Sequence, residues 1–168
     1  MKYFRYIFLL VTVGCSSSKV AYDYDEGTTF SKYKTYGFFE DAGEGLNDID
    51  AKRFMESVGK HLDSLGFRKV EKPDFYINIV SEKAEIPKNN NVGIGVGGNS
   101  GLSISTGIFF GGNKIKEKIT IDFVESSNNK LFWQGVLNAK VKEKIKPEDR
   151  ETLVGQMVSK ILNKYPPK

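Results

Sequence analysis

The sequence predicts an α+β fold, in which a largely antiparallel sheet of about five strands carries two helices packed on one face. Two observations lead to this prediction. Several short segments alternate apolar and polar residues, and two longer segments carry apolar residues at helical spacing. Their order along the chain is β-β-α-β-(Gly-rich loop)-β-β-α. Alternating strands bury only one face, so both helices are expected on the same side of the sheet.

The first half of the domain is predicted to hold two strands and a helix. Residues 20–25 and 33–39 are aromatic-rich strand candidates. Asn47 or Asp48 can cap the following helix, and Gly66 suits the left-handed position just beyond its end. The apolar stripe of this helix consists of Phe54, Val58, His61, Leu62 and Leu65.

The second half is predicted to hold three strands and a helix. Pro73-Asp74 opens a strand with an alternating apolar face, and residues 126–129 have the composition of a turn between the last two strands. Folding that hairpin brings Phe123 beside Trp133 as a cross-strand aromatic pair. Pro147 suits the first turn of the final helix. The buried stripe of that helix is expected to be Leu153, Val154, Met157, Val158, Ile161 and Leu162.

A glycine-rich insertion at 92–112 interrupts the strands. It holds eight of the chain's 17 glycines and no charged residue. Because glycine is costly to order, a flexible excursion is the default interpretation. The insertion is nevertheless too apolar for a plain linker, so we also consider a segment that becomes ordered against a partner. The candidate contact residues are Ile94, Val96, Leu102, Ile104, Phe109 and Phe110.

The N-terminus is typical of a secreted, lipid-anchored protein. Residues 1–14 combine a short basic region with an apolar run that is too short to span a bilayer, as in a signal peptide. Cys15 is the only cysteine, and the run Leu9–Cys15 resembles a bacterial lipobox, with Thr12 where leucine is commonest. A chance thiol is the alternative. Acylation of Cys15 would leave residues 15–19 as anchor and tether and 20–168 as a single domain.

The residues after the cysteine indicate where in the cell envelope the protein would be located. Ser16 stands where an aspartate would mark retention at the inner membrane, which favours the outer membrane. No acidic residue lies within 16–19, which favours a domain that faces the periplasm. Loss of residues 1–14 would also reduce the net charge from +4 to +2. That balance argues against a nucleic-acid-binding protein, whose affinity depends on clustered basic residues.

A ladder of lysines is expected on the outward face of the last hairpin. Such a ladder would suit contact with anionic lipid head groups. It would equally keep an exposed sheet soluble and block edge-to-edge pairing, which is the interpretation that we favour. The residues are Lys116, Lys118, Lys140, Lys142 and Lys144.

No residue set matches a known catalytic chemistry. Asp23 and Asp25 share a strand face and could serve hydrolysis, although a solvated strand is the simpler interpretation. His61, the only histidine, falls in or beside an apolar helical stripe, which predicts partial burial. One histidine and one cysteine cannot complete a structural zinc site. We therefore expect no enzymatic activity, no metal and no cofactor.

Several segments, taken in order behind the lipobox, carry a family resemblance. The chain resembles the envelope lipoproteins grouped as domain-of-unknown-function family 4136, from about residue 20 to residue 168. The resemblance implies a Gram-negative envelope lipoprotein with an α+β domain, no assigned activity and no functional residues to transfer. The segments are Val20-Ala21-Tyr22-Asp23-Tyr24-Asp25, Phe30-Ser31-Lys32-Tyr33-Lys34-Thr35-Tyr36, Pro73-Asp74-Phe75, Leu131-Phe132-Trp133-Gln134-Gly135 and Ile161-Leu162-Asn163-Lys164-Tyr165-Pro166-Pro167.

Three functions remain open at this stage. The leading hypothesis is a non-enzymatic binding or adaptor module that meets an envelope protein through the insertion and the exposed edge of the last hairpin. The second is a carrier of lipid or another small ligand, with an apolar cavity between Trp133 and the helices. The third and least favoured is a hydrolase that uses Asp23 and Asp25. The oligomeric state is left undetermined.

Overall fold

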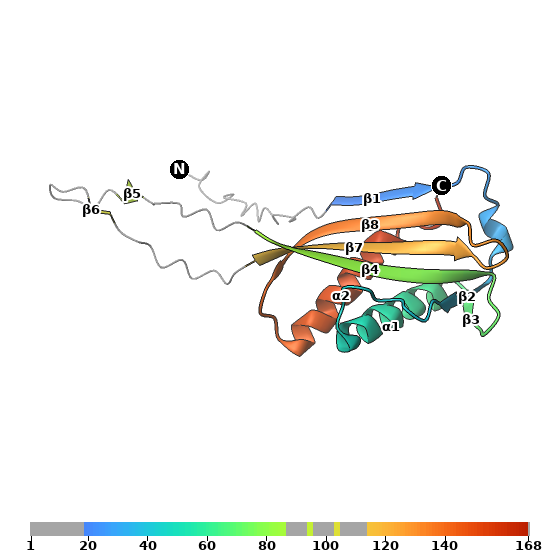
Figure 1. Ribbon diagram of the computed structural model, residues 1–168, viewed down its shortest axis with the longest axis horizontal. Coiled ribbons are helices and arrows are strands. Elements are labelled where there is room, and N and C mark those ends of the chain that lie inside the picture. The colour runs from blue at the N-terminus through green and yellow to red at the C-terminus, as the bar shows by residue number, and fades with distance from the viewer. Residues whose placement is uncertain (1–18, 87–93, 96–102, 105–113, 168) are drawn as a thin grey trace, which may run out of the picture.

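The computed structural model describes residues 19–86, 94–95, 103–104 and 114–167. A six-stranded sheet carries two α-helices on one face (Figure 1). Its strands are β1 (Lys19–Tyr24), β2 (Thr35–Phe38), β3 (Arg68–Lys69), β4 (Phe75–Glu85), β7 (Lys114–Glu125) and β8 (Leu131–Lys142). The helices are α1 (Asp48–Ser64) and α2 (Pro147–Leu162), with a short 3₁₀ helix η1 (Phe30–Lys32). Strands β5 (Ile94–Gly95) and β6 (Ser103–Ile104) form a separate antiparallel pair. The predicted α+β class is confirmed.

The sheet is mixed rather than purely antiparallel. Its order is β1-β8-β7-β4-β2-β3, with antiparallel pairing from β1 to β4 and parallel pairing of β2 with both β4 and β3. The chain leaves β2 through α1 before it returns to β3 and β4, and strands joined by such a helical crossover run parallel. The two-residue strand β3 was not predicted, because so short a segment has no periodicity to detect.

Both ends of α1 follow the predicted signals. The side chain of Asn47 accepts a hydrogen bond from the backbone N–H of Asp50. At the other end, Gly66 has a φ of 89° and its N–H donates to the carbonyl of Asp63, while the next N–H reaches back to Leu62. This paired arrangement closes the helix with a left-handed glycine.

The helices bury most of their predicted stripes against the sheet. Leu65 is the exception on α1, at 48% exposed, because the helix has already ended at Ser64. His61 is half-buried, as expected, and Leu153 on α2 is also only partly buried. The stripe residues that are buried are Phe54, Val58 and Leu62 on α1 and Val154, Met157, Val158, Ile161 and Leu162 on α2.

The last hairpin forms the middle of the sheet. Phe123 lies opposite Trp133 in its register, and their ring centroids are 4.8 Å apart, which confirms the predicted aromatic pair. The prediction that this hairpin has an exposed edge is wrong for most of the hairpin's length. Strand β4 pairs along β7, and β1 pairs with β8 from Asn138 back to Trp133.

In the described part of the chain, no helix is both long and apolar enough to cross a bilayer.

Gly135 permits the close approach of α2 to β8. A Cβ placed on Gly135 would lie 2.6 Å from the ring of Trp133 and would also collide with the side chain of Ile161. Gly155, in the middle of α2, has no atom within 4 Å of the same position. The two glycines therefore differ in packing, although both are embedded in regular elements.

We expect Gly135→Ala to lower the free energy of unfolding by about 1–3 kcal/mol, because overpacking forces neighbouring side chains to move. The matched control Gly155→Ala should raise it by about 0.5–1 kcal/mol, since alanine loses less backbone entropy in a helix. Urea denaturation of the two variants beside the parent protein measures both effects. A Gly135→Ala protein as stable as the parent would contradict this packing.

Candidate functional site

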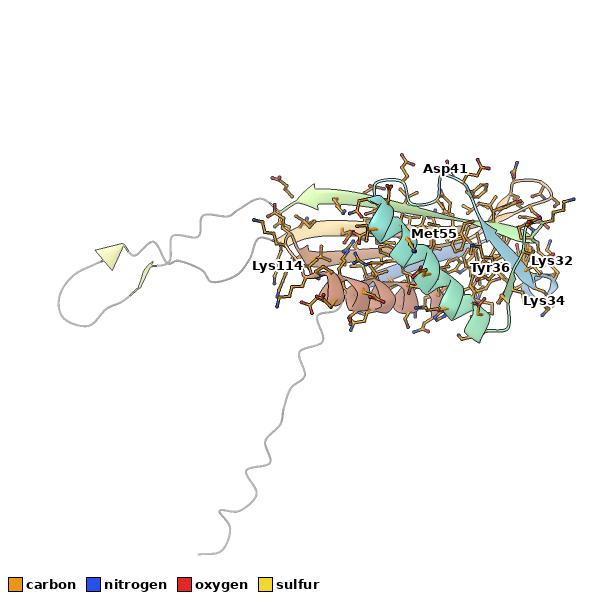
Figure 2. The ribbon with its side chains drawn as sticks, turned by 90° about the horizontal axis from the view of Figure 1, so that it is seen from below. Lys32, Lys34, Tyr36, Asp41, Met55 and Lys114 are labelled. Carbon is orange, nitrogen blue, oxygen red and sulfur yellow. The ribbon has the colours of Figure 1, made fainter. Side chains whose placement is uncertain are left out.

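One end of the domain gathers most of its unusual features, and we call it the insertion end. Strand β4 finishes here at Glu85 and β7 begins here at Lys114, so the insertion leaves the sheet from this end. Both helices also begin here. Arg150, near the start of α2, contacts Asp50, near the start of α1. Figure 2 shows Lys114 at this end and Lys34 at the opposite one.

A cleft of about 520 Å³ opens between the two helix N-termini and the ends of β4, β7 and β8. Its rim is basic and partly apolar, and its floor is a cluster of buried charged groups. The rim residues include Ile49, Arg53, Lys83, Lys142, Lys144 and Ile145, and the floor residues are Asp50, Glu117 and Arg150.

The floor is held together by Arg150. Its two terminal nitrogens each donate to one carboxylate oxygen of Glu117 at 2.8 Å, and its Nε donates to Asp50 at 3.1 Å. The side chain of Glu117 is fully buried, and those of Arg150 and Asp50 are 8% and 9% exposed. The hydrogen bonds from Arg150 to Glu117 raise the pKa of the guanidinium, so Arg150 stays charged.

Further groups satisfy the remaining oxygens of the floor. Arg53 donates to Asp50 at 3.0 Å, and the hydroxyl of Ser81 lies 3.4 Å from Glu117. The ammonium of Lys83 is 4.0 Å from Glu117. Every nitrogen of the Arg150 guanidinium already donates to a carboxylate. Arg150 is therefore a structural tie between α1, α2 and β7, and a ligand entering the cleft would meet the basic rim instead.

Sequence reasoning missed this cluster, although a signal was present. Glu117 falls on the same face of its strand as the buried residues Ile119, Ile121 and Phe123. It therefore places a charge on an otherwise apolar inward face. Asp50 and Arg150 each lie four residues before a buried apolar residue of their helices, Phe54 and Val154. Charged residues that extend three apolar stripes in this way are expected to meet at the end of the core.

The predicted strand lysines face the opposite side of the same strands, although Lys142, at the very end of β8, also lines the cleft. Lys116 is paired with Lys140 across β7 and β8, and Lys118 is paired with Asn138. Lys116, Lys140 and Lys142 are exposed, and Lys118 donates to Glu82 at 2.9 Å. Lys144 lies beyond the end of β8 and lines the cleft rim. The register thus brings the strand lysines together on the open face.

The two aspartates border a small hollow of about 210 Å³ near the end of β1. Asp25 lies just beyond β1, and its carboxylate accepts a hydrogen bond from Lys130 at 2.6 Å. That bond holds the pKa of the Asp25 carboxyl below its usual value. A general acid of a glycosidase needs a raised pKa instead. Asp25 therefore resembles a structural ion pair, and the pair with Asp23 gains no support as a catalytic couple.

The other candidate residues do not join a shared site. Partial burial lowers the pKa of His61, and among the described residues no group of three metal-binding side chains is close enough to hold an ion. Ile94 and Ile104 are paired across β5 and β6. The remaining candidates, Cys15, Val96, Leu102, Phe109 and Phe110, lie outside the described residues.

The space beside Trp133 is filled. Trp133 is fully buried, and its ring lies 4.8 Å from Phe123 and 5.3 Å from Tyr165 between centroids. On the helix side, Gly135 has no room for even a Cβ beside Ile161. A carrier of the predicted kind needs an apolar cavity at this place, and the described side chains occupy it.

Removal of Arg150 should be the most damaging single change at the floor. We expect Arg150→Met to lower the free energy of unfolding by about 3–5 kcal/mol, because it leaves Glu117 charged and buried without its main partner. The double variant Arg150→Met/Glu117→Leu should recover most of that loss. Chemical denaturation of both single variants and the double variant gives the coupling energy. A coupling energy near zero would contradict the tie between α2 and the sheet.

Comparisons with known proteins agree with this architecture. In a crystal structure of a PDZ domain protein from Parabacteroides distasonis, the matching region has a TM-score of 0.59 and 14% identity, covering 90% of this chain but 36% of that longer one. Two structures of a PelC dodecamer from Paraburkholderia phytofirmans give TM-scores of 0.54 and 0.52 at 9% identity, each covering 87% of this chain and 95% or 96% of the other. These likenesses show the fold alone.

No curated protein sequence matched the chain. The family comparison gives a clear result, because a model described as a domain of unknown function, DUF4136, matches residues 20–167. The matched range includes both helices and all of the six-stranded sheet except the first residue of β1. The chain belongs to the DUF4136 family.

Proposed function

We propose that this protein is a lipid-anchored adaptor of the cell envelope, acylated at Cys15 and without enzymatic activity. In this proposal the anchor holds the domain at the periplasmic face of the outer membrane. The residues of the insertion then bind an envelope protein. The proposal extends beyond the family assignment, which carries no activity.

One observation supports this proposal best, namely that the anchor and the insertion leave the domain on the same side. Strand β1 begins at Lys19, four residues after Cys15, and runs antiparallel to β8 with Lys19 opposite Asn138. Strand β8 continues from there to Lys142 at the insertion end. A membrane-held domain would thus present its insertion close to the membrane, where an envelope partner would meet it.

The packing of the domain fits an adaptor better than a carrier. The region between sheet and helices is filled around Trp133, so a ligand cannot enter there without unfolding part of the core. The features available for binding lie on the surface instead, namely the cleft and the strand ends at the insertion end. Surface contacts are what a binding module requires.

Acylation is tested by replacing the thiol that would carry it. We expect Cys15→Ser to move the protein from the membrane fraction to the soluble periplasmic fraction of the native host, because stable anchoring requires the covalent acyl chains. Intact-mass measurement of the parent protein should show a chain that begins at residue 15 and carries acyl groups. A parent protein that has lost residues 1–14 but has no added lipid mass would contradict the anchor.

Partner binding is tested by crosslinking in intact cells, followed by mass spectrometry of the captured proteins. Deletion of residues 92–112 should remove a partner that the parent protein captures reproducibly. A second variant keeps the length of the insertion and replaces its six apolar candidates with serine: Ile94, Val96, Leu102, Ile104, Phe109 and Phe110. Loss in both variants would assign the contact to these side chains, whereas an unchanged capture pattern in both would refute the adaptor.

A further inference from the structure

Five lysines on the open face of the sheet form what we call the lysine patch: Lys114, Lys116, Lys118, Lys140 and Lys142. The register places Lys114 directly opposite Lys142 and Lys116 directly opposite Lys140. In the part of the chain that the structure describes, the single carboxylate paired with the patch is that of Glu82, which binds Lys118. The patch is therefore a concentration of positive charge at the insertion end.

The arrangement is costly in the isolated domain. Like charges directly opposite each other on neighbouring strands destabilise a sheet, and this occurs twice in the patch. Protection of a sheet edge accounts for Lys140 and Lys142, since β1 reaches only Asn138. It does not account for Lys116 or Lys118, because β7 lies between β4 and β8 at those positions. An anionic surface would offset the repulsion among all five.

The proposed anchor would bring such a surface within reach. Lys19 lies four positions after Cys15, and a fully extended chain spans at most about 14 Å over four such steps. Lys19 pairs with Asn138, which lies two residues from Lys140, a distance of about 7 Å along a strand. An acylated Cys15 therefore keeps the lysine patch close enough to reach the head groups, and within a Debye length of about 8–10 Å their attraction is only partly screened.

We propose that the lysine patch binds the anionic lipid head groups of the membrane in which Cys15 is held, so that the domain rests on the bilayer by its insertion end. This inference rests on the proposed acylation of Cys15. The lysines of the opposite end, which include Lys34, then point away from the membrane (Figure 2). The orientation follows from the short tether and the position of the charge together.

The test uses the acylated full-length protein in vesicles that contain a lipid with a nitroxide on its head group. Cys15 is the only cysteine, so an introduced thiol can be labelled specifically once Cys15 carries lipid. A fluorophore is placed at Asn138→Cys, beside the patch, or at Ser127→Cys, in the turn at the far end of the hairpin. Vesicles of phosphatidylethanolamine and phosphatidylglycerol are compared with vesicles of phosphatidylcholine alone.

We expect phosphatidylglycerol to increase quenching at position 138 relative to position 127, and high ionic strength to remove the increase. The decisive readout is this dependence on anionic lipid, because proximity to the anchor alone would quench position 138 equally in both kinds of vesicle. The triple variant Lys116→Gln/Lys140→Gln/Lys142→Gln should reduce the increase at least about twofold, since each lysine near an anionic bilayer strengthens binding about fivefold.

A matched triple variant removes the same charge from the opposite end: Lys34→Gln/Lys69→Gln/Lys72→Gln. It should leave the quenching pattern of the parent protein unchanged. Equal quenching ratios in the two kinds of vesicle, or equal effects of the two triple variants, would overturn the inference. The patch would then serve to keep the protein soluble or to bind an acidic protein partner. Intact mass is measured on the same samples, so a failure of acylation is recognised separately from a failure of the patch.

Discussion

The hydrogen-bonded pairing of Arg150 with Glu117 and Asp50 determines the geometry of the insertion end. The inward face of β7 is apolar from Phe123 to Ile119 and then becomes charged at Glu117. Beyond that point, Ile115 and Val141 continue the apolar packing only as far as the cleft that they line. Because Arg150 contacts a carboxylate on each of two other elements, it fixes α2 relative to both β7 and α1. The two helix N-termini and the cleft between them depend on this one side chain.

Such a cluster defines a geometry more than it adds stability. Burying three charged groups costs several kcal/mol for each ion before any attraction is gained, so apolar residues of similar volume would often serve stability as well. The two-pronged bond to Glu117 nevertheless tolerates little displacement. The cluster thus holds the strand ends in a fixed arrangement, which the proposed binding surface would require.

Local patterns in the sequence predicted the elements well, and their pairing less well. The hairpin was predictable because Phe123 and Trp133 are close in sequence and share a turn. Pairing of β2 beside β4 was not, since it depends on where α1 returns the chain. The cluster of Asp50, Glu117 and Arg150 joins residues up to 100 positions apart, and each has an ordinary local interpretation when taken alone. The local clues to such a contact are a charged residue on the inward face of a strand and charged residues that extend the apolar stripes of two helices.

The buried charged cluster and the exposed lysines both result from the way successive side chains of β7 point to opposite faces of the sheet. Along β7, Lys116 and Lys118 face outward on either side of Glu117, which faces inward. Arg150 satisfies the carboxylate from within, so the acidic residue closest to these lysines in sequence contributes nothing to the charge of the open face. An outward carboxylate at this position would have offset one of the positive charges of the patch. The inward orientation of Glu117, which Arg150 stabilises, is thus one reason why a domain with nearly balanced charge has a basic patch on its open face.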